Sequence, residues 1–203
     1  MTSAGRNVET AADELVVRAK SDREAFGQLY DRFFPLVHGY CYRRLFDSTA
    51  ADDVSSDVFL QVARAIRQFP GHTEQDFRRW VYRIATNAIN ALLRQKLRHG
   101  DLLRRAVDLG RWKMPEAGPQ GVHENDTEAD AVREAMSHLN LREKTVLALR
   151  FMEGMSYEEV GNVLNVRPAT LRVVASRAIK NLRRRLSNRL RSPAASQGER
   201  PAP

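Results

Sequence analysis

The chain has little of what would tie it to a membrane or to an oxidising compartment. Its single cysteine, Cys41, permits no internal disulfide and favours a reducing compartment. No apolar run approaches the ~18 residues that a membrane span requires, so we expect no direct membrane insertion. The first residues, Met1–Ala12, lack a long apolar core, and we therefore expect no secretory signal. Together these absences predict a cytoplasmic protein.

The sequence also lacks the groups of residues that catalysis usually requires. It has no glycine-rich phosphate loop and no serine-centred nucleophile motif. His38 and Cys41 lie three residues apart on one expected helix, but two ligands without a second pair are a weak metal signal. A buried thiol beside a partly buried imidazole is the better interpretation. We therefore expect no enzyme, no metal site and no cofactor.

Positive charge is what the chain has in excess. Lys and Arg total 33 against 25 Asp and Glu, and the net charge of +8 favours a polyanionic partner. The charge is also unevenly distributed. From Val166 to Arg191 there are nine Lys or Arg residues and no acidic residue, whereas Asp126–Asn165 holds eight acidic and four basic residues. The basic segment Val166–Arg191 therefore offers a surface for an anion.

Composition and hydrophobic periodicity predict an all-α protein of two small helical domains joined by a flexible linker. The first domain is expected over residues 10–99 and the second over residues 126–190. The intervening residues 100–125 are rich in Gly and Pro, which a helix interior would not tolerate. Residues 1–9 and 191–203 are expected to be disordered, the latter because Pro, Ala, Ser and Gln dominate the tail.

Four helices are expected in the first domain, at Thr10–Lys20, Ser21–Leu45, Asp47–Gln68 and Asp76–Arg98. Pro35 lies inside the second and predicts a kink or a split. The last helix carries basic and amide side chains on one face, with aromatic residues near its start. That combination suits single-stranded nucleic acid, because cations follow the backbone and rings stack on unpaired bases. The side chains concerned are Arg79, Trp80, Tyr82, Arg83, Asn87, Asn90 and Arg94.

A plainer interpretation of that helix stays open. Phe77 and Trp80 would belong to the hydrophobic core, and the arginines would be solvated. The sequence alone does not decide between the two.

The stretch Ser156–Leu190 is typical of a helix-turn-helix. Ser156 and Glu159 form a capping box, Asn165 suits the end of the first helix, and Pro168 suits the first turn of the second. The second helix is expected to bury an apolar stripe and to expose a basic face, as a recognition helix in a major groove does. Its exposed face is expected to comprise Ala169, Arg172, Val173, Ser176, Arg177, Lys180 and Arg184.

The order and spacing of these pieces resemble the extracytoplasmic-function sigma factors, the two-domain initiation factors of bacterial transcription. The resemblance covers about residues 10–99 and 126–187. In the first domain it rests on Glu24–Phe26, Leu29–Pro35, Ala51–Asp53, Asp57–Leu60 and Trp80–Asn87. In the second it rests on Leu147–Phe151, Gly154–Val160 and Ser176–Ala178.

The resemblance implies a protein that binds core RNA polymerase and directs promoter recognition, DNA melting and transcription initiation. The polymerase-binding residues it implies are Asp52, Asp53, Asp57 and Phe59, facing the clamp helices of the largest subunit. The residues implied to read the melted −10 element are Arg79, Trp80, Arg83, Asn87, Asn90 and Arg94. Those implied to read the −35 element in duplex DNA are Ala169, Thr170, Arg172, Val173, Ser176, Arg177 and Lys180. An anti-sigma factor is a further possible partner, since members of this family are often held inactive by one.

Several positions depart from the family pattern. Ser56 stands where Gln is usual, Asn90 replaces a common Asp, and Arg167 stands where Ser or Thr normally caps the recognition helix. Val173 occupies the middle of the reading face, where it either contacts a thymine methyl or touches nothing. Two alternatives stay open: a sigma-like protein that has lost activity, and a helix-turn-helix regulator that binds DNA without polymerase.

Overall fold

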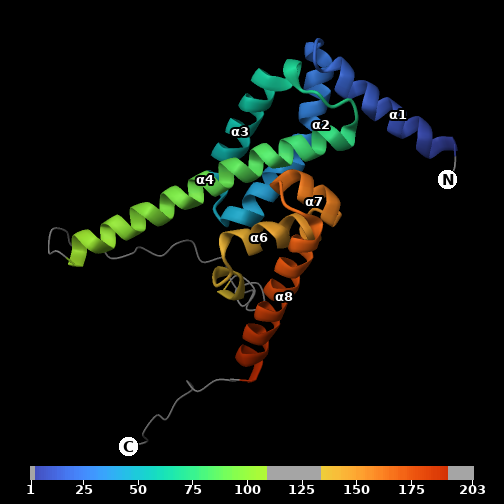
Figure 1. Ribbon diagram of the computed structural model, residues 1–203. Helices are drawn as coiled ribbons and strands as arrows, with labels where there is room; N and C mark the ends of the chain where they lie inside the picture. The colour runs from blue at the N-terminus through green and yellow to red at the C-terminus, as the bar shows by residue number, and fades with distance from the viewer. Residues whose placement is uncertain (1–2, 109–133, 192–203) are drawn as a thin grey trace, which may run out of the picture.

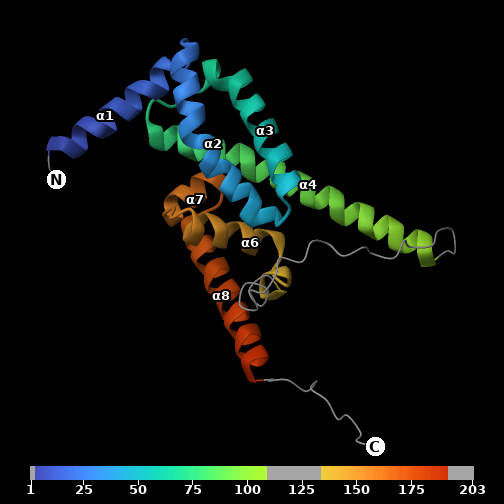
Figure 2. The ribbon, with the colours of Figure 1, turned by 180° about the vertical axis from the view of Figure 1, so that it is seen from behind.

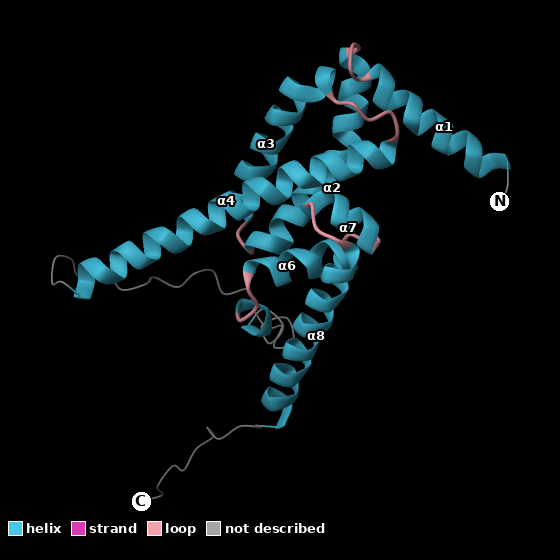
Figure 3. Ribbon diagram, in the orientation of Figure 1, coloured by secondary structure: helices cyan, strands magenta, loops and turns pink. Residues whose placement is uncertain are grey.

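The computed structural model describes residues 3–108 and 134–191, and every regular element in these ranges is a helix (Figures 1 and 3). The first unit comprises α1 (Ser3–Arg18), α2 (Arg23–Leu45), α3 (Ser48–Ala65), the short 3₁₀ turn η1 (Ile66–Gln68) and α4 (Glu74–Asp108). The second unit comprises α6 (Leu141–Leu147), the π-helical turn η2 (Ala148–Met152), α7 (Tyr157–Leu164) and α8 (Pro168–Arg191). The predicted all-α class is confirmed. None of the described helices is both long and apolar enough to cross a membrane.

The first unit packs α1 to α4 around an apolar core. Its helices begin where the sequence supplies side-chain caps: Asp22 accepts a hydrogen bond from the Glu24 amide at 2.9 Å, and Asp47 accepts one from the Ala50 amide at 3.0 Å. Residues at helical spacing then turn inward. The largest fully buried side chains of this core are Leu29, Phe33, Tyr40, Phe77, Tyr82 and Ile89.

Two helix boundaries differ from the sequence predictions, and α2 is not divided at Pro35. Helix α1 begins at Ser3, so residues 3–9 are helical rather than disordered. Helix α4 continues to Asp108, and residues 100–108 of the expected linker are helical. A single Gly inside a helix costs only about 1 kcal/mol, which a long helix tolerates. Pro35 does not split α2, because Phe33 and Val37 on either side are buried in the core and hold the helix together.

Other expectations lie partly or wholly outside the described residues. The linker beyond Asp108 and the tail from residue 192 are outside them. Of the expected helix Asp126–His138, only residues 134–138 are described; residues 134–137 are helical, and His138 lies in the turn that follows. The expected helix Leu141–Glu153 instead ends its α-helical part at Leu147 and continues as η2.

The two units pack against each other in this structure. Both views place α7 beside α4, with α8 running away from the first unit (Figures 1 and 2). Arg44, at the end of α2, is 5% exposed and donates to the Thr145 hydroxyl of α6 at 2.7 Å and to the side-chain oxygen Oδ1 of Asn90 on α4 at 3.1 Å. One buried cation thus joins helices from both units.

Candidate functional site

The helix-turn-helix has the geometry that its sequence predicts. Ser156 Oγ accepts from the Glu159 amide at 3.1 Å, and Glu159 Oε2 accepts from the Ser156 amide at 2.7 Å, which confirms the capping box. Asn165 ends α7, as predicted, and its backbone is in the left-handed conformation. Gly161 makes the tight turn possible, because a Cβ there would lie 2.7 Å from the carbonyl oxygen of Val166. Local sequence therefore sets the angle at which α8 leaves α7.

Ser156→Ala is expected to lower the free energy of unfolding by about 0.5–2 kcal/mol, because the Glu159 amide loses its cap. Urea unfolding followed by circular dichroism measures this change. Ser56→Ala, at an exposed position inside α3, is the matched control and should change stability by less than about 0.5 kcal/mol. Equal effects of the two substitutions would contradict the role assigned to the cap.

The second helix of the motif, α8, presents the predicted basic face to solvent. Leu171, Ala175 and Ala178 are fully buried, which confirms the centre of the apolar stripe. Arg172 is oriented from α7: its guanidinium lies 3.0 Å from Glu158 Oε1 and 5.4 Å from the centre of the Tyr157 ring. All seven residues expected to read the −35 element are exposed, namely Ala169, Thr170, Arg172, Val173, Ser176, Arg177 and Lys180.

The start of α4 holds an ordered, partly buried polar cluster. Arg79 Nη2 lies 2.5 Å from Asp76 Oδ1, and Asp76 also accepts from the backbone amides of His72 and Thr73. Partial burial raises the pKa of Asp76, but hydrogen bonds from the Thr73 hydroxyl, Arg79 and these amides outweigh it and lower the pKa to about 2. The carboxylate therefore fixes both the loop before α4 and the direction of Arg79.

Asp76 is expected to make stability fall as the pH falls from about 4 to about 2. A depressed folded-state pKa gives stability that is present above the unfolded value and lost as pH falls through the folded value. The effect should be on the order of 1 kcal/mol, allowing for solvent screening of the partly exposed carboxylate. Thermal melts of Asp76→Asn and wild type should differ at pH 6 and converge near pH 2. Asp53→Asn, at an exposed position on α3, is the control for simple loss of charge.

Aromatic residues of α4 pack more deeply than a base-stacking surface would. Trp80 is partly buried, and its ring stacks on Phe69 with centroids 4.7 Å apart, while Phe77 meets its edge at 5.8 Å. The expectation that Tyr82 stacks on bases is wrong, because Tyr82 is 1% exposed and its hydroxyl donates to Glu153 Oε2 at 2.6 Å. The plainer interpretation, in which these aromatic residues belong to the hydrophobic core, thus holds for Phe77 and in part for Trp80.

Some polar side chains of α4 are exposed along the helix, and others contact neighbouring helices. Asn87 and Arg94 are exposed along the helix. Arg83 is exposed but donates to the backbone carbonyl of Asn162 in α7, and Asn90 accepts from the buried Arg44. The six residues expected to read the −10 promoter element therefore all lie on α4, but they do not form one open face in this arrangement.

The acidic start of α3 forms an exposed patch. Asp52, Asp53 and Asp57 are all exposed, and Asp52 accepts from His38 Nε2 at 2.7 Å. The resemblance implied that Phe59 contacts polymerase, but its side chain is only 4% exposed. It packs beneath the patch against Tyr30 and Phe34, with ring centroids 4.9 and 5.6 Å apart.

One exposed apolar residue beside this patch was not among the residues expected to bind polymerase. Leu60, next to Phe59 in the chain, is 53% exposed beside the acidic patch. The signal that could have found it is the helical period. Leu60 follows the exposed Ser56 and Asp57 by four and three residues, so the helical period places it on their face.

Cys41 is a buried thiol, as the sequence suggested. It is fully buried, and burial raises the pKa of its thiol to about 12. His38 pairs with Asp52 rather than with Cys41. In the described ranges no three residues of the His, Cys, Asp and Glu types gather as they would around a metal ion.

Comparison with known proteins gives the class of this fold. The Sigma-70 region 2 model matches residues 29–99, and the Sigma-70 region 4 model matches residues 135–184. These ranges contain the acidic patch and α4 as far as residue 99 in the first unit, and α7 with α8 as far as residue 184 in the second. The two units are those of a sigma-70-type transcription initiation factor.

Individual relatives narrow the class. The chain is 31% identical over 179 residues to the ECF RNA polymerase sigma factor BldN of Streptomyces coelicolor, with 85% of this chain and 65% of that protein covered. It is 30% identical over 180 residues to the ECF RNA polymerase sigma-E factor of Haemophilus influenzae, with 81% and 89% covered. The chain belongs to the extracytoplasmic-function sigma factors. It is an alternative sigma factor, a DNA-binding regulator that directs core RNA polymerase in transcription initiation.

Solved structures agree with this fold. CnrH, in complex with the cytosolic domain of CnrY, superposes with a TM-score of 0.63 at 25% identity, covering 91% of this chain and 99% of that one. The sigma factor RpoE of Bartonella quintana, in complex with the anti-sigma factor NepR, superposes with a TM-score of 0.59 at 16% identity, covering 80% and 96%.

Proposed function

We propose that three surfaces of this chain divide the work of initiation. The acidic patch of α3 (Asp52, Asp53 and Asp57), with Leu60 beside it, binds core polymerase. Helix α4 binds the melted −10 element, and α8 reads the −35 element as duplex. The observation that carries the proposal is the exposed basic face of α8 over a fully buried apolar stripe. That geometry is how a recognition helix presents side chains to a major groove.

On α4, the proposal assigns the capture of unpaired bases to a reduced set of side chains. Trp80 offers the part of its ring that Phe69 leaves uncovered. Arg83, Asn87 and Arg94 supply exposed cations and an amide, which follow a single-stranded backbone and contact base edges. Asn90 supports the helix through Arg44 rather than facing the solvent.

The proposal extends to where and with whom the factor acts. We place its activity in the cytoplasm, with core RNA polymerase and promoter DNA as partners and without catalysis of its own. CnrH was solved with the cytosolic domain of CnrY bound, and the Bartonella sigma factor was solved with the anti-sigma factor NepR bound. By analogy, an anti-sigma protein is a fitting regulatory partner for this chain.

Transcription in vitro tests the proposal directly. Purified chain is mixed with core polymerase and a library of promoter fragments, and start sites are mapped by sequencing the transcripts. Defined start sites that depend on the chain are the expected result. Absence of both core binding and start-site selection would overturn the proposal and favour a regulator that acts without polymerase.

A further inference from the structure

The loop between η1 and α4 is held by residues of the first two helices and the turn that joins them. This loop, residues 69–73, leads directly into the helix proposed to bind the melted −10 element. Lys20, in the turn between α1 and α2, donates from Nζ to the carbonyl oxygen of Gly71 at 2.7 Å. The two residues are 51 positions apart in the chain, so this contact exists only because the helices pack as they do.

Lys20 also contacts the aromatic side chain that begins the loop. Its ammonium lies 5.5 Å from the centre of the Phe69 ring, which is the geometry of a cation–π contact. Phe69 is 7% exposed, and its ring stacks on Trp80 of α4 with an angle of 22° between the ring planes. A continuous series of contacts therefore joins the α1–α2 turn, through Phe69, to Trp80.

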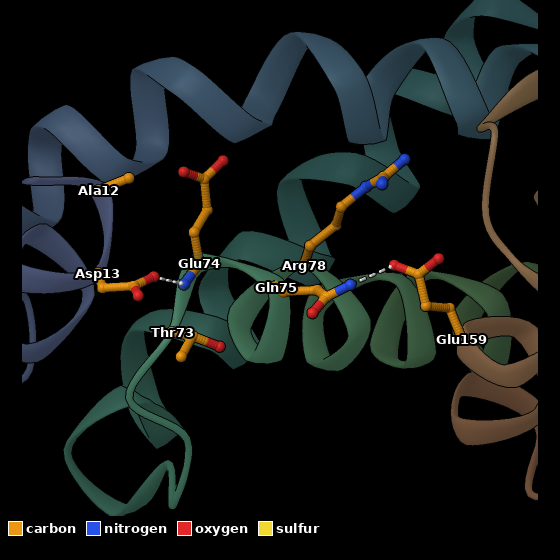
Figure 4. Close-up of a pocket in the computed structure, with 7 residues that line it drawn as sticks. All are labelled: Ala12, Asp13, Thr73, Glu74, Gln75, Arg78 and Glu159. Carbon is orange, nitrogen blue, oxygen red and sulfur yellow. Dashed lines mark hydrogen bonds between the residues drawn. The ribbon is translucent and has the colours of Figure 1, made fainter. Parts of the chain in front are cut away.

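The end of the loop is held from α1 and α2 as well. Asp13 of α1 accepts from the backbone amide of Glu74 at 2.7 Å, as the dashed line in Figure 4 shows. This amide is one of the first four of α4 and has no partner within its own helix, so Asp13 satisfies it from another element. The carboxylate of Glu74 in turn lies 2.8 Å from Arg32 Nη2 on α2.

The middle of the loop is closely packed. A Cβ at Gly71 would lie 2.5 Å from Asp76 Cβ and would also overlap the Phe69 ring, so glycine is required at this position. The carbonyl oxygen of Gly71 accepts a charge-assisted hydrogen bond, which is stronger than a neutral one. The loop is thus packed against α4 on one side and bound by Lys20 through its backbone.

We propose that Lys20 is a positioning residue for the −10 surface, acting through Gly71 and Phe69 on the orientation of Trp80. A surface that is already ordered loses less conformational entropy on binding, and it therefore binds its ligand more tightly. Lys20 needs no contact with DNA for this effect. The effect on DNA rests on the proposed role of α4, whereas the effect of Lys20 on Trp80 in the free protein does not.

The first experiment follows Trp80 in the full chain without DNA. Trp112→Phe leaves Trp80 as the only tryptophan, and acrylamide quenching of its fluorescence then reports how well Phe69 covers the indole. In this background Lys20→Met should raise the quenching constant, and Lys20→Arg, which keeps a cation that can stack and donate, should restore it. Arg23→Met removes the same charge at an exposed position of α2 and should match the parent. Circular dichroism melts verify that each variant is folded.

The second experiment uses the holoenzyme and a promoter fragment selected in the transcription assay described above. Anisotropy measures binding of a fork DNA, in which the −35 element is duplex and the −10 non-template strand is unpaired, and of the −35 duplex alone. Lys20→Met should weaken fork binding about fivefold or more, the lower end of what loss of one stacked base costs, and leave duplex binding unchanged. Trp80→Ala, the reference variant, should weaken fork binding at least as much.

The possible failures are distinguishable. An unchanged quenching constant in Lys20→Met would overturn the proposal, because Lys20 would not hold Trp80. Weaker fork binding in Trp80→Ala but not in Lys20→Met would also overturn it, while the proposed function would stand. Unchanged fork binding in Trp80→Ala, or selection of no promoter fragment at all, would contradict the proposed function itself, and the positioning role of Lys20 would fail with it.

Discussion

Phe77→Ala is expected to lower the free energy of unfolding by about 3–5 kcal/mol, the cost of truncating a fully buried aromatic side chain. Phe77 is 1% exposed at the start of α4. Its ring meets those of Phe33, Phe69 and Trp80 with centroids 4.9, 6.0 and 5.8 Å apart. Truncation removes these contacts and leaves a cavity where α4 joins the core.

Scanning calorimetry checks the prediction through the melting temperature. A change of this size should lower Tm by roughly 10 °C, since 1 kcal/mol corresponds to about 2–4 °C in a chain of this length. Leu97→Ala is the matched control on the same helix, because Leu97 is 64% exposed, and it should change stability by less than about 0.5 kcal/mol. Similar shifts for the two variants would show that Phe77 is not the anchor of α4.

The same substitution should also weaken promoter opening. Trp80 is held between Phe69 and Phe77, and loss of Phe77 frees the indole to change its orientation. Permanganate footprinting of melted thymines, at a temperature where Phe77→Ala is still folded, would detect the loss.

Arg172→Ala and Arg177→Ala are each expected to weaken binding of the −35 element by about 1–3 kcal/mol, or roughly 5- to 150-fold. Both side chains project from the exposed face of α8, and Arg172 is held in place by Glu158 and Tyr157. If the arginine contacts base edges, its truncation reduces the ability of the protein to discriminate between DNA sequences. Truncating an arginine that contacts phosphate weakens binding of all DNA sequences about equally. It also reduces the slope of log K against log salt concentration by about 1.

Fluorescence anisotropy of duplex promoter with the holoenzyme, repeated at several salt concentrations, separates these two outcomes. Core binding is measured in parallel and should not change. Arg142→Ala is the control, since Arg142 is an exposed arginine of the same unit that lies on α6 rather than α8. Loss of core binding in the α8 variants would show that this face meets polymerase instead of DNA.

Local features of the chain were predictable because their causes lie within a few residues. The capping box of Ser156 and Glu159 and the helix end at Asn165 each depend on contacts between near neighbours, and both are confirmed. The buried stripe of α8 follows from the 3.6-residue period. Boundaries were less predictable, as α4 shows by continuing through Gly100, where packing and helix length outweigh one unfavourable residue.

The sequence by itself determined that this is an all-α protein with two helical units, and that an exposed, purely basic helix follows a capped acidic one. Only the tertiary structure decided which side chains of those helices remain available. Tyr82 is buried and donates to Glu153, 71 residues away, and Arg43 reaches the same carboxylate across 110 residues. Phe59 lies beneath the acidic patch instead of on it. Periodicity assigns a residue to a face of its own helix, but the partner that covers that face depends on how the helices pack.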